Sequence, residues 1–116
     1  MAWEVITTDE YDVWFLEQTK DGQASIQMKV EFLKEYGPHL PRPHADTLKG
    51  SKLRNMKELR SHTESHIFRV AFLFDEERKA VLLIGGDKKG KDEKRFYKNL
   101  IKHAEEIYSQ YLNERR

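Results

Sequence analysis

Two strongly apolar runs separated by one short turn constrain the fold of this chain most. Ile67–Phe74 (IFRVAFLF) and Ala80–Ile84 (AVLLI) are rich in β-branched and aromatic residues, and Asp75–Arg78 between them is polar. This pattern is typical of a β-hairpin with buried faces. Asn55–Arg60 precedes it as a third predicted strand, joined through a connection at Ser61–Ser65. The three runs are therefore expected to form an antiparallel meander.

Helical patterns precede the meander. Trp3–Thr7 predicts a short first strand at a sheet edge, and a helix capped by Thr8 or Asp9 is expected to follow it. Asp21-Gly22 is expected to break that helix, and a second helix then covers about Gln23–Tyr36. A short turn between two helices favours an antiparallel helix pair.

The remaining segments are a loop and a last helix. Gly37 ends the second helix, and the three prolines of Gly37–Pro43 (GPHLPRP) exclude regular structure there. A helix begins near Asp92 or Glu93 and carries one apolar stripe. The stripe consists of Phe96, Tyr97, Leu100, Ile101, Ala104, Ile107, Tyr108, Tyr111 and Leu112. The sequence thus predicts an α+β fold in one domain over residues 1–116, with two N-terminal helices on an antiparallel sheet of about four strands, plus a C-terminal helix.

Composition narrows the class of function. The 116 residues include no cysteine, so disulfides, thiolate nucleophiles and cysteine-based zinc sites are excluded. No apolar run approaches the roughly 20 residues of a membrane span, and the N-terminus is acidic, so we expect a cytoplasmic protein. Residues 1–37 carry eight acidic and three basic side chains, whereas residues 38–116 carry twelve acidic and eighteen basic ones. The basic excess lies beyond the predicted helix pair.

One basic segment, Asp46–Arg60 (DTLKGSKLRNMKELR), concentrates cations on a loop and a strand. Its cations are Lys49, Lys52, Arg54, Lys57 and Arg60, opposed by Asp46 and Glu58 alone. A small domain with such a local cluster has a polyanion as its first candidate ligand. A solvated charged surface without a ligand is the competing interpretation.

The predicted strands bring charges onto one sheet face. In Ile67–Phe74, the two-residue period places the Arg69 side chain on the opposite sheet face from Phe68 and Val70. By the same period, Glu58 and Arg60 share one face of the adjacent strand. An arginine in an apolar strand is costly unless it is paired or faces an open surface. The pattern predicts a charged platform of Glu58, Arg60 and Arg69, or else a purely structural Glu–Arg pair.

Two motifs are weaker. GGDKKGKD over residues 85–92 nearly matches a phosphate-binding loop, but Asp92 replaces the hydroxyl that would bind magnesium. His62 and His66 are four residues apart across a predicted turn, and no third strong zinc ligand accompanies them. We therefore expect no metal and no cofactor, and a basic loop that contacts RNA phosphates.

The ordered segments GPHLPRPHADTLKGS, NMKELR, IFRV, LLIGGDK and RFY…AEEIYSQYL resemble the RelE/ParE superfamily of bacterial type II toxin–antitoxin modules. The resemblance covers Trp3 to Leu112 and points to the HigB-like branch, which includes phage-derived Gp49-like proteins. It implies a RelE-like microbial RNase fold and a ribosome-dependent mRNA endoribonuclease that needs no metal. It also implies a cognate antitoxin, of helix-turn-helix type, as partner, and contact with DNA only through the antitoxin complex.

The resemblance also implies site residues. Arg69 matches the arginine that contacts the scissile phosphate, Arg60 the arginine that ends the ELR strand, and Lys88 or Lys89 the basic residue after the last strand. Tyr97 lies where some members place a stacking or proton-donating tyrosine. RelE itself has lysines where this chain has Met56 and Glu58, so Glu58 becomes the candidate base. Candidate RNA-binding residues are Arg42, Lys49, Lys52, Arg54, Lys57 and Lys91.

Two other functions are compatible with the same resemblance. A ParE-like toxin would inhibit DNA gyrase by binding, and a degenerate member would only bind its antitoxin. The retained cations Arg60, Arg69 and Lys88 favour the nuclease.

Overall fold

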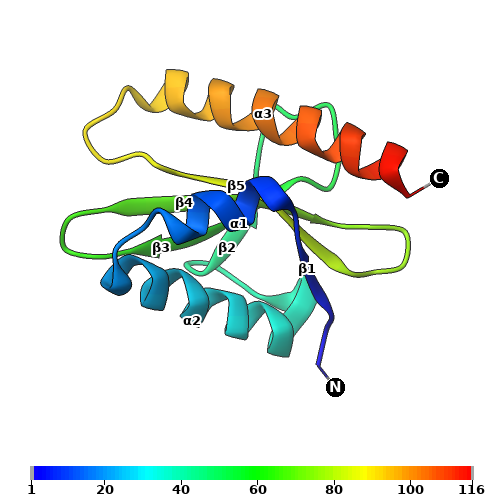
Figure 1. The fold of residues 1–116 in the computed structure, drawn as a ribbon, viewed down its shortest axis with the longest axis horizontal. Coiled ribbons are helices and arrows are strands. Elements are labelled where there is room, and N and C mark those ends of the chain that lie inside the picture. The colour runs from blue at the N-terminus through cyan, green and yellow to red at the C-terminus, as the bar shows by residue number, and fades with distance from the viewer. Residues whose placement is uncertain (1, 116) are drawn as a thin grey trace.

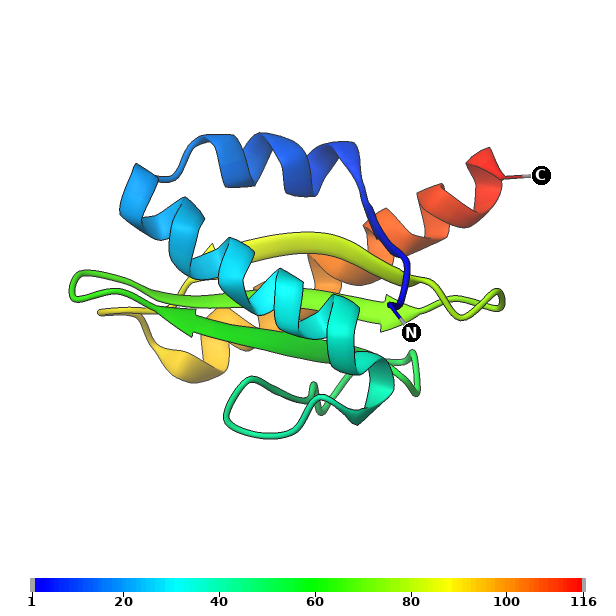
Figure 2. The same cartoon turned by 90° about the horizontal axis from the view of Figure 1, so that it is seen from below.

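The computed structural model describes residues 2–115 as three layers. A five-stranded sheet lies between α1 and α2 on one face and α3 on the other, as Figures 1 and 2 show from two directions. In chain order the elements are β1 (Val5–Thr7), α1 (Asp9–Leu16), α2 (Lys20–Tyr36), a 3₁₀ turn (Gly37–His39), β2 (Ala45–Thr47), β3 (Lys57–His62), β4 (Ile67–Phe74), β5 (Ala80–Asp87) and α3 (Glu93–Glu114). The predicted α+β class is confirmed.

The strand order is β1-β5-β4-β3-β2. β1 pairs in parallel with β5, whereas the other three pairings are antiparallel. The meander of β3, β4 and β5 and the edge position of β1 agree with the sequence-based expectation. β2, the fifth strand, was not predicted, because its three polar-flanked residues carry no alternating pattern of their own.

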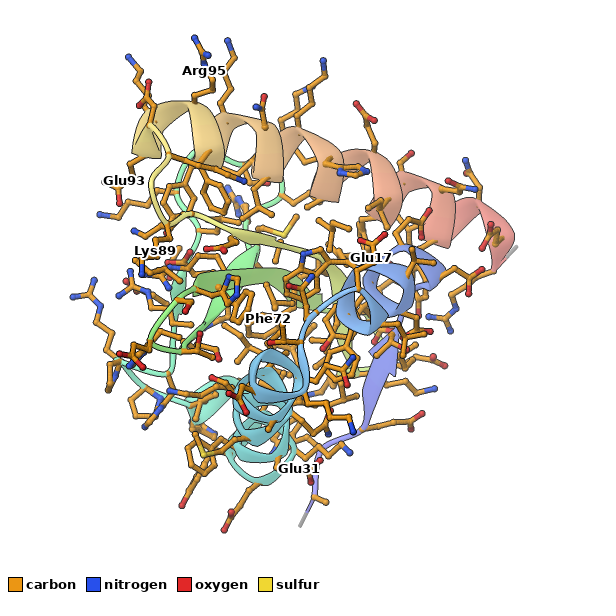
Figure 3. The ribbon with its side chains drawn as sticks, turned by 60° about the vertical axis from the view of Figure 1, so that its left-hand side comes forward. Glu17, Glu31, Phe72, Lys89, Glu93 and Arg95 are labelled. Carbon is orange, nitrogen blue, oxygen red and sulfur yellow. The ribbon has the colours of Figure 1, made fainter. Side chains whose placement is uncertain are left out.

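The sheet separates two hydrophobic clusters. Phe68, Val70 and Phe72 of β4 pack with the apolar faces of α1 and α2, and Figure 3 shows Phe72 beside α2. Ala71 and Leu73 point to the opposite face and pack under α3. Alternate side chains of β4 therefore contribute to the hydrophobic clusters on both faces of the sheet, and Arg69 lies on the face that α3 covers.

The break between α1 and α2 lies earlier than predicted. The Thr19 side chain accepts a hydrogen bond from the Gly22 backbone N–H at 3.1 Å and caps α2, which begins at Lys20. Gly22 is thus inside the first turn of α2, where the absence of a side chain leaves room for the Phe68 ring. Capping by the threonine outweighs the helix-breaking tendency of glycine.

Other boundaries shift by a few residues. β3 begins at Lys57 rather than Asn55, because the Met56 N–H bonds back to the Leu53 carbonyl at 3.2 Å and closes a turn. The predicted loop after Gly37 contains a short 3₁₀ turn, which a proline in its first turn permits. None of the helices described is long and apolar enough to cross a membrane.

β5 continues past its predicted end at Ile84 through Asp87. Gly85 and Gly86 lie within this strand. At both positions an aromatic ring occupies the space that a side chain would fill. A Cβ on Gly85 would lie 2.4 Å from the Trp14 ring of α1, and one on Gly86 would lie 3.0 Å from Phe96 of α3. The two glycines let helices from both layers approach the sheet closely.

Candidate functional site

The register of β3 and β4 builds the charged platform predicted from the sequence. Arg60 of β3 lies directly opposite Arg69 of β4, and Glu58 precedes Arg60 by two residues on the same face. Two arginines in direct cross-strand contact repel each other unless an anion lies between them. Glu58 supplies that anion: its Oε2 accepts a hydrogen bond from Arg60 Nε at 3.0 Å, and its Oε1 lies 3.7 Å from Arg69 Nε.

The three charges differ in exposure. The Glu58 side chain is 3% exposed, that of Arg69 is 12% exposed and that of Arg60 is 34% exposed. Within residues 2–115, Glu58 Oε1 is buried without a hydrogen-bond partner. A buried carboxylate is tolerated when cations compensate it, and the contact with Arg60 is a charge-assisted hydrogen bond. The free oxygen is the unusual feature of this site.

Tyr97 extends the platform from α3. Arg69 Nε donates a hydrogen bond to the Tyr97 hydroxyl oxygen at 3.1 Å, while the Arg69 Nη1 donates to the Phe68 carbonyl at 2.9 Å. Burial, and then the neighbouring Glu58 carboxylate, raise the pKa of the Tyr97 phenol, although Arg69 acts in the opposite direction. The phenol is therefore protonated at neutral pH and is a weaker acid than a free tyrosine.

Lys88 lies at the same end of the sheet. Its Nζ is 5.5 Å from the centre of the Tyr97 ring and donates a hydrogen bond to Glu93 Oε1 at 2.6 Å. That hydrogen bond is the main reason that the pKa of Glu93 is lowered, and Arg69 and Arg60 lower it further. Lys88, Arg60 and Arg69 thus form one group of cations around the Tyr97 side chain.

Lys89 has a different direction. Its Nζ donates to the backbone carbonyl of Glu64, in the β3–β4 connection, at 2.9 Å. Its backbone N–H donates to Asp87 Oδ1 at 3.0 Å. Figure 3 shows Lys89 and Glu93 at the same end of the molecule, where the β5–α3 loop begins and ends. The structure therefore separates the two lysines, which the sequence left as alternatives.

Asp46 is a member of the site that the sequence analysis missed. β2 places Asp46 directly opposite Glu58, and Asp46 Oδ2 lies 3.0 Å from Arg42 Nε and 3.5 Å from Arg60 Nη2. The hydrogen bond from the Thr47 N–H, followed by that from Arg42, lowers the pKa of Asp46. Only the pairing of β2 with β3 reveals this link, so no local sequence signal identifies it.

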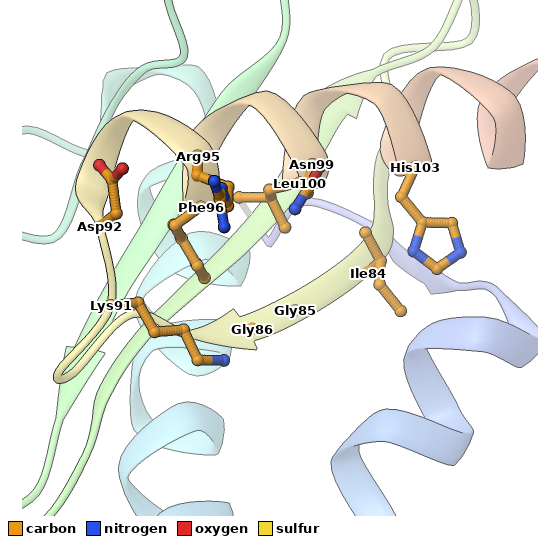
Figure 4. A pocket seen from close by; sticks show the side chains of 10 residues that line it. All are labelled: Ile84, Gly85, Gly86, Lys91, Asp92, Arg95, Phe96, Asn99, Leu100 and His103. Carbon is orange, nitrogen blue, oxygen red and sulfur yellow. The ribbon is translucent and has the colours of Figure 1, made fainter.

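The other candidate RNA-binding residues are spread over the surface. Lys49, Lys52 and Arg54 are exposed in the segment between β2 and β3, which the Lys52 N–H ties to Glu105 of α3 at 2.6 Å. Lys57 is half-buried, and because β3 pairs with β4 without irregularity, it points away from the face of Glu58. Lys91 lines a cavity between β5 and α3 (Figure 4).

The weaker motifs take structural positions. Of the segment resembling a phosphate loop, Gly85–Asp87 belongs to β5, and Asp92 caps α3 by accepting from the Lys94 N–H at 3.1 Å. His66 Nδ1 lies 2.6 Å from Asp87 Oδ2, and its ring stacks on Phe68. Among the residues described, no group of three histidine or acidic side chains is arranged to hold a metal ion.

Comparison with known proteins identifies the family of this chain. Residues 13–109 match the family described as phage derived protein Gp49-like (DUF891). The chain is 39% identical over 108 residues to the candidate toxin HigB3 of Mycobacterium tuberculosis, covering 93% of this chain and 92% of that protein. It is also 39% identical over 105 residues to the candidate toxin HigB2 of the same organism, covering 90% of this chain and 52% of that protein.

A solved structure agrees with the fold. The crystal structure of the toxin–antitoxin complex RelBE2 from Mycobacterium tuberculosis contains a chain that superposes with a TM-score of 0.55 at 17% identity, covering 75% of this chain and 99% of that one. This similarity confirms the RelE-like arrangement of helices and sheet. By sequence, the chain belongs to the phage-derived Gp49-like (DUF891) family and is a homologue of HigB toxins.

Proposed function

We propose that this protein is the toxin of a type II toxin–antitoxin module and cuts mRNA on the ribosome. The observation that carries the proposal is the buried Glu58 carboxylate between Arg60 and Arg69, with the Tyr97 phenol hydrogen-bonded to Arg69. An anion, two cations and a proton donor within one contact network match the requirements of RNA cleavage by an internal hydroxyl. Homology to HigB toxins supports the same assignment.

The reaction needs a base, an acid and charge stabilisation. In the proposed mechanism, substrate binding uncovers the Glu58 carboxylate, which is 3% exposed in the free protein. The carboxylate then accepts the proton of a ribose 2′-hydroxyl, and the 2′-oxygen attacks the adjacent phosphorus. The P–O5′ bond then breaks, leaving a 2′,3′-cyclic phosphate and a 5′-hydroxyl. Tyr97 donates the proton to the departing 5′-oxygen. Every proton has a donor and an acceptor among these residues, and no metal is required.

The cations stabilise the transition state. The pentavalent phosphorane carries more negative charge on its oxygens than the ground state, and guanidinium groups match its geometry with two parallel N–H donors. Arg60 is the most exposed of the three platform residues and is therefore placed to meet the phosphate first. Arg69 and Lys88 complete the group, and Lys89 acts from the hairpin side. Glu58 orients both arginines in addition to its role as base.

The remaining cations would bind RNA backbone. Arg42 connects to the platform through Asp46, and Lys49, Lys52 and Arg54 extend the positive surface along the segment before β3. Lys57 and Lys91 would add contacts outside the platform. Such contacts give affinity and make binding dependent on salt, without choosing a sequence. In this proposal the ribosome presents the mRNA, and a cognate antitoxin, expected to be a helix-turn-helix protein, silences the toxin.

Primer extension on mRNA from cells that express the protein tests the proposal. New 5′ ends should appear within coding regions in wild-type cells and be absent with Arg69→Ala, which removes the platform cation nearest the phenol. Lys98→Ala, on the exposed outer side of α3, is the matched control and should cut normally. Intact transcripts during growth arrest would refute the nuclease, and a DNA supercoiling assay would then test the gyrase alternative. Absence of growth arrest would favour an inactive antitoxin binder.

A further inference from the structure

Arg60 lies between two carboxylates. Its Nε donates a hydrogen bond to Glu58 Oε2 at 3.0 Å, and its Nη2 lies 3.5 Å from Asp46 Oδ2. Glu58 and Asp46 are direct cross-strand partners on β3 and β2, so the two anions would repel each other without a cation between them. Arg60 therefore depends on both carboxylates for its position, and both depend on Arg60 for their neutralisation.

The hydrophobic core fixes the sheet face on which Asp46 lies. In the three-residue strand β2, Ala45 pairs with Leu59, and both side chains are buried in the cluster that contains the apolar face of α2. Because side chains alternate along a strand, the next residue, Asp46, lies on the other face, together with Glu58 and Arg60. A slip of one residue would move Asp46 to the apolar face, so burial of Ala45 keeps Asp46 beside the platform.

The two oxygens of Asp46 have separate partners. Oδ1 accepts a hydrogen bond from the Thr47 N–H at 2.8 Å, whereas Oδ2 faces Arg42 Nε at 3.0 Å and Arg60 Nη2. The Asp46 side chain is only 21% exposed, although that of Arg42 is 72% exposed. The Thr47 hydrogen bond, followed by that from Arg42, lowers the pKa of Asp46, so the carboxylate is charged at neutral pH. Asp46 is thus an anion whose direction is set by its own strand.

These contacts leave one end of the Arg60 guanidinium free. Both carboxylates bind the edge that is formed by Nε and Nη2, and within residues 2–115 the Nη1 group takes part in no hydrogen bond. Nη1 and the outer N–H of Nη2 form the end of the planar group, and two parallel donors of this kind match two oxygens of a phosphate. Asp46 and Glu58 together therefore determine which end of Arg60 meets a ligand.

We propose, on the basis of the proposed function, that Asp46 is a positioning residue that acts through Arg60 and holds the Nη1 end of its guanidinium toward the scissile phosphate. This hold matters most after Glu58 has taken the 2′-hydroxyl proton, because a neutral carboxyl group binds a guanidinium less strongly than a carboxylate does. Asp46 is still charged at that stage. It keeps Arg60 where negative charge develops on the phosphorane.

The competing interpretation is that Asp46 only reduces the positive charge of this surface. Loss of its charge would then strengthen the binding of RNA phosphates and would not slow cleavage, since each additional net cation adds affinity. A positioning role predicts slower cleavage instead. Arg60 would lose one of its two fixed contacts, and a misdirected guanidinium stabilises the transition state less.

Single-turnover cleavage of ribosome-bound mRNA tests this role. Asp46→Asn keeps the size of the side chain and should lower the rate at saturating ribosomes by about tenfold, while the half-saturating concentration stays within about twofold. Arg42→Gln removes the other arginine on Asp46 and should instead raise the half-saturating concentration. Asp21→Asn, the same change in the exposed first turn of α2, is the matched control and should alter neither quantity. A rate for Asp46→Asn equal to or above that of the wild type would overturn the proposal.

Arg60→Lys shows whether Asp46 acts through Arg60. A lysine has no fork to orient, so adding Asp46→Asn to the Arg60→Lys protein should lower its rate by less than about twofold. Losses that multiply in the double variant would mean that Asp46 acts by another route, and the proposal would fail.

A measurement without RNA separates this proposal from the nuclease proposal. Nitrogen-15 NMR of the arginine side chains reports the rotation of the Arg60 guanidinium. Rotation should be slow in the wild type and in Asp21→Asn, and several-fold faster in Asp46→Asn. Equal rotation rates in all three proteins would overturn the positioning role even if cleavage fell. Absence of cleavage by the wild type would refute the nuclease, and the NMR comparison would still decide whether Asp46 fixes Arg60.

Discussion

Arg60 and Arg69 are direct cross-strand partners on β3 and β4, with the Glu58 carboxylate held between them. This arrangement places two guanidinium groups around one buried carboxylate. It also makes Glu58 essential to the local structure, because its removal leaves two guanidinium groups facing each other. A substitution at Glu58 is therefore expected to change both the stability of the protein and the rate of cleavage, and both must be measured.

Glu58→Gln keeps the shape of the side chain and removes its charge. Cleavage should fall by about 10²–10⁴-fold, the usual contribution of a general base. The free energy of unfolding should fall by about 1–3 kcal/mol, less than for a fully buried pair because Arg60 is 34% exposed. A ribosome-programmed cleavage assay and urea unfolding measure the two effects. Cleavage that changes by less than about threefold would exclude Glu58 as the base.

Tyr97→Phe separates the proton donor from the packing of α3. The ring and its contact with Phe96 remain, while Arg69 loses the hydroxyl that accepts from its Nε. We expect cleavage to fall by about 10²-fold with little change in thermal stability. Single-turnover cleavage of ribosome-bound mRNA is the measurement. A normal rate would show that another group protonates the 5′-oxygen.

Lys88 and Lys89 form a natural matched pair. Lys88→Met should slow cleavage by about 10-fold or more, because its ammonium group lies beside the Tyr97 ring and the arginines. Lys89→Met should have a smaller effect, since its ammonium group binds the Glu64 carbonyl. Both variants lose the same charge, so salt-dependent RNA affinity is controlled. Equal loss in the two variants would contradict the distinction.

His44 makes stability depend on pH. Its Nδ1 lies 2.8 Å from Lys29 Nζ, and burial, followed by the Lys29 charge, lowers the pKa of His44 below its ordinary value of 6.5. Below that value the unfolded chain binds the proton more readily than the folded one, so stability falls as the pH drops below about 6.5. His44→Gln accepts from Lys29 without titrating and should flatten this part of the curve. Urea unfolding of both proteins at pH 7 and pH 5 is the test, and parallel curves would refute it.

Gly85→Ala tests the close approach of α1 to β5. A Cβ at this position would lie 2.4 Å from the Trp14 ring, so the helix must shift. The free energy of unfolding should fall by about 1–3 kcal/mol, as in other overpacked cores. Trp14→Leu in the same chain should recover part of the loss by making room for the methyl group. Additive losses in the double variant would show that the two residues do not compete for space.

Much of the fold is encoded in local patterns. The alternation of Ile67–Phe74 and the apolar stripe of α3 predicted which residues face the core, and the structure buries most of them. At the C-terminal end of the stripe the prediction was wrong for Leu112, which is 39% exposed. A cap at Thr8 or Asp9 was likewise predicted, and the structure shows Thr8 in that position, since its side chain accepts from the Tyr11 N–H at 3.1 Å. The predictions of buried faces were possible because the period of a strand or helix fixes the direction of each side chain within its own segment.

The platform was predictable in part. The two-residue period predicted that Glu58, Arg60 and Arg69 lie on one sheet face, but it did not predict that Glu58 contacts both arginines. The addition of Asp46 depends on a three-residue strand without a pattern, and the different directions of Lys88 and Lys89 depend on the turn after β5. Loops lack a repeating backbone geometry, so the directions of their side chains cannot be predicted from the sequence alone.

The sequence by itself therefore determined the elements, their buried faces and the choice of charged residues. Only the tertiary structure decided that Arg60 faces Arg69, that one Glu58 oxygen has no hydrogen-bond partner among the described residues, and that β2 places Asp46 opposite Glu58. The physical reason is that periodicity is a property of each segment, whereas register and strand length come from pairing between segments. Contacts that join β3 to β4 and α3 to the sheet exist only after those pairings form.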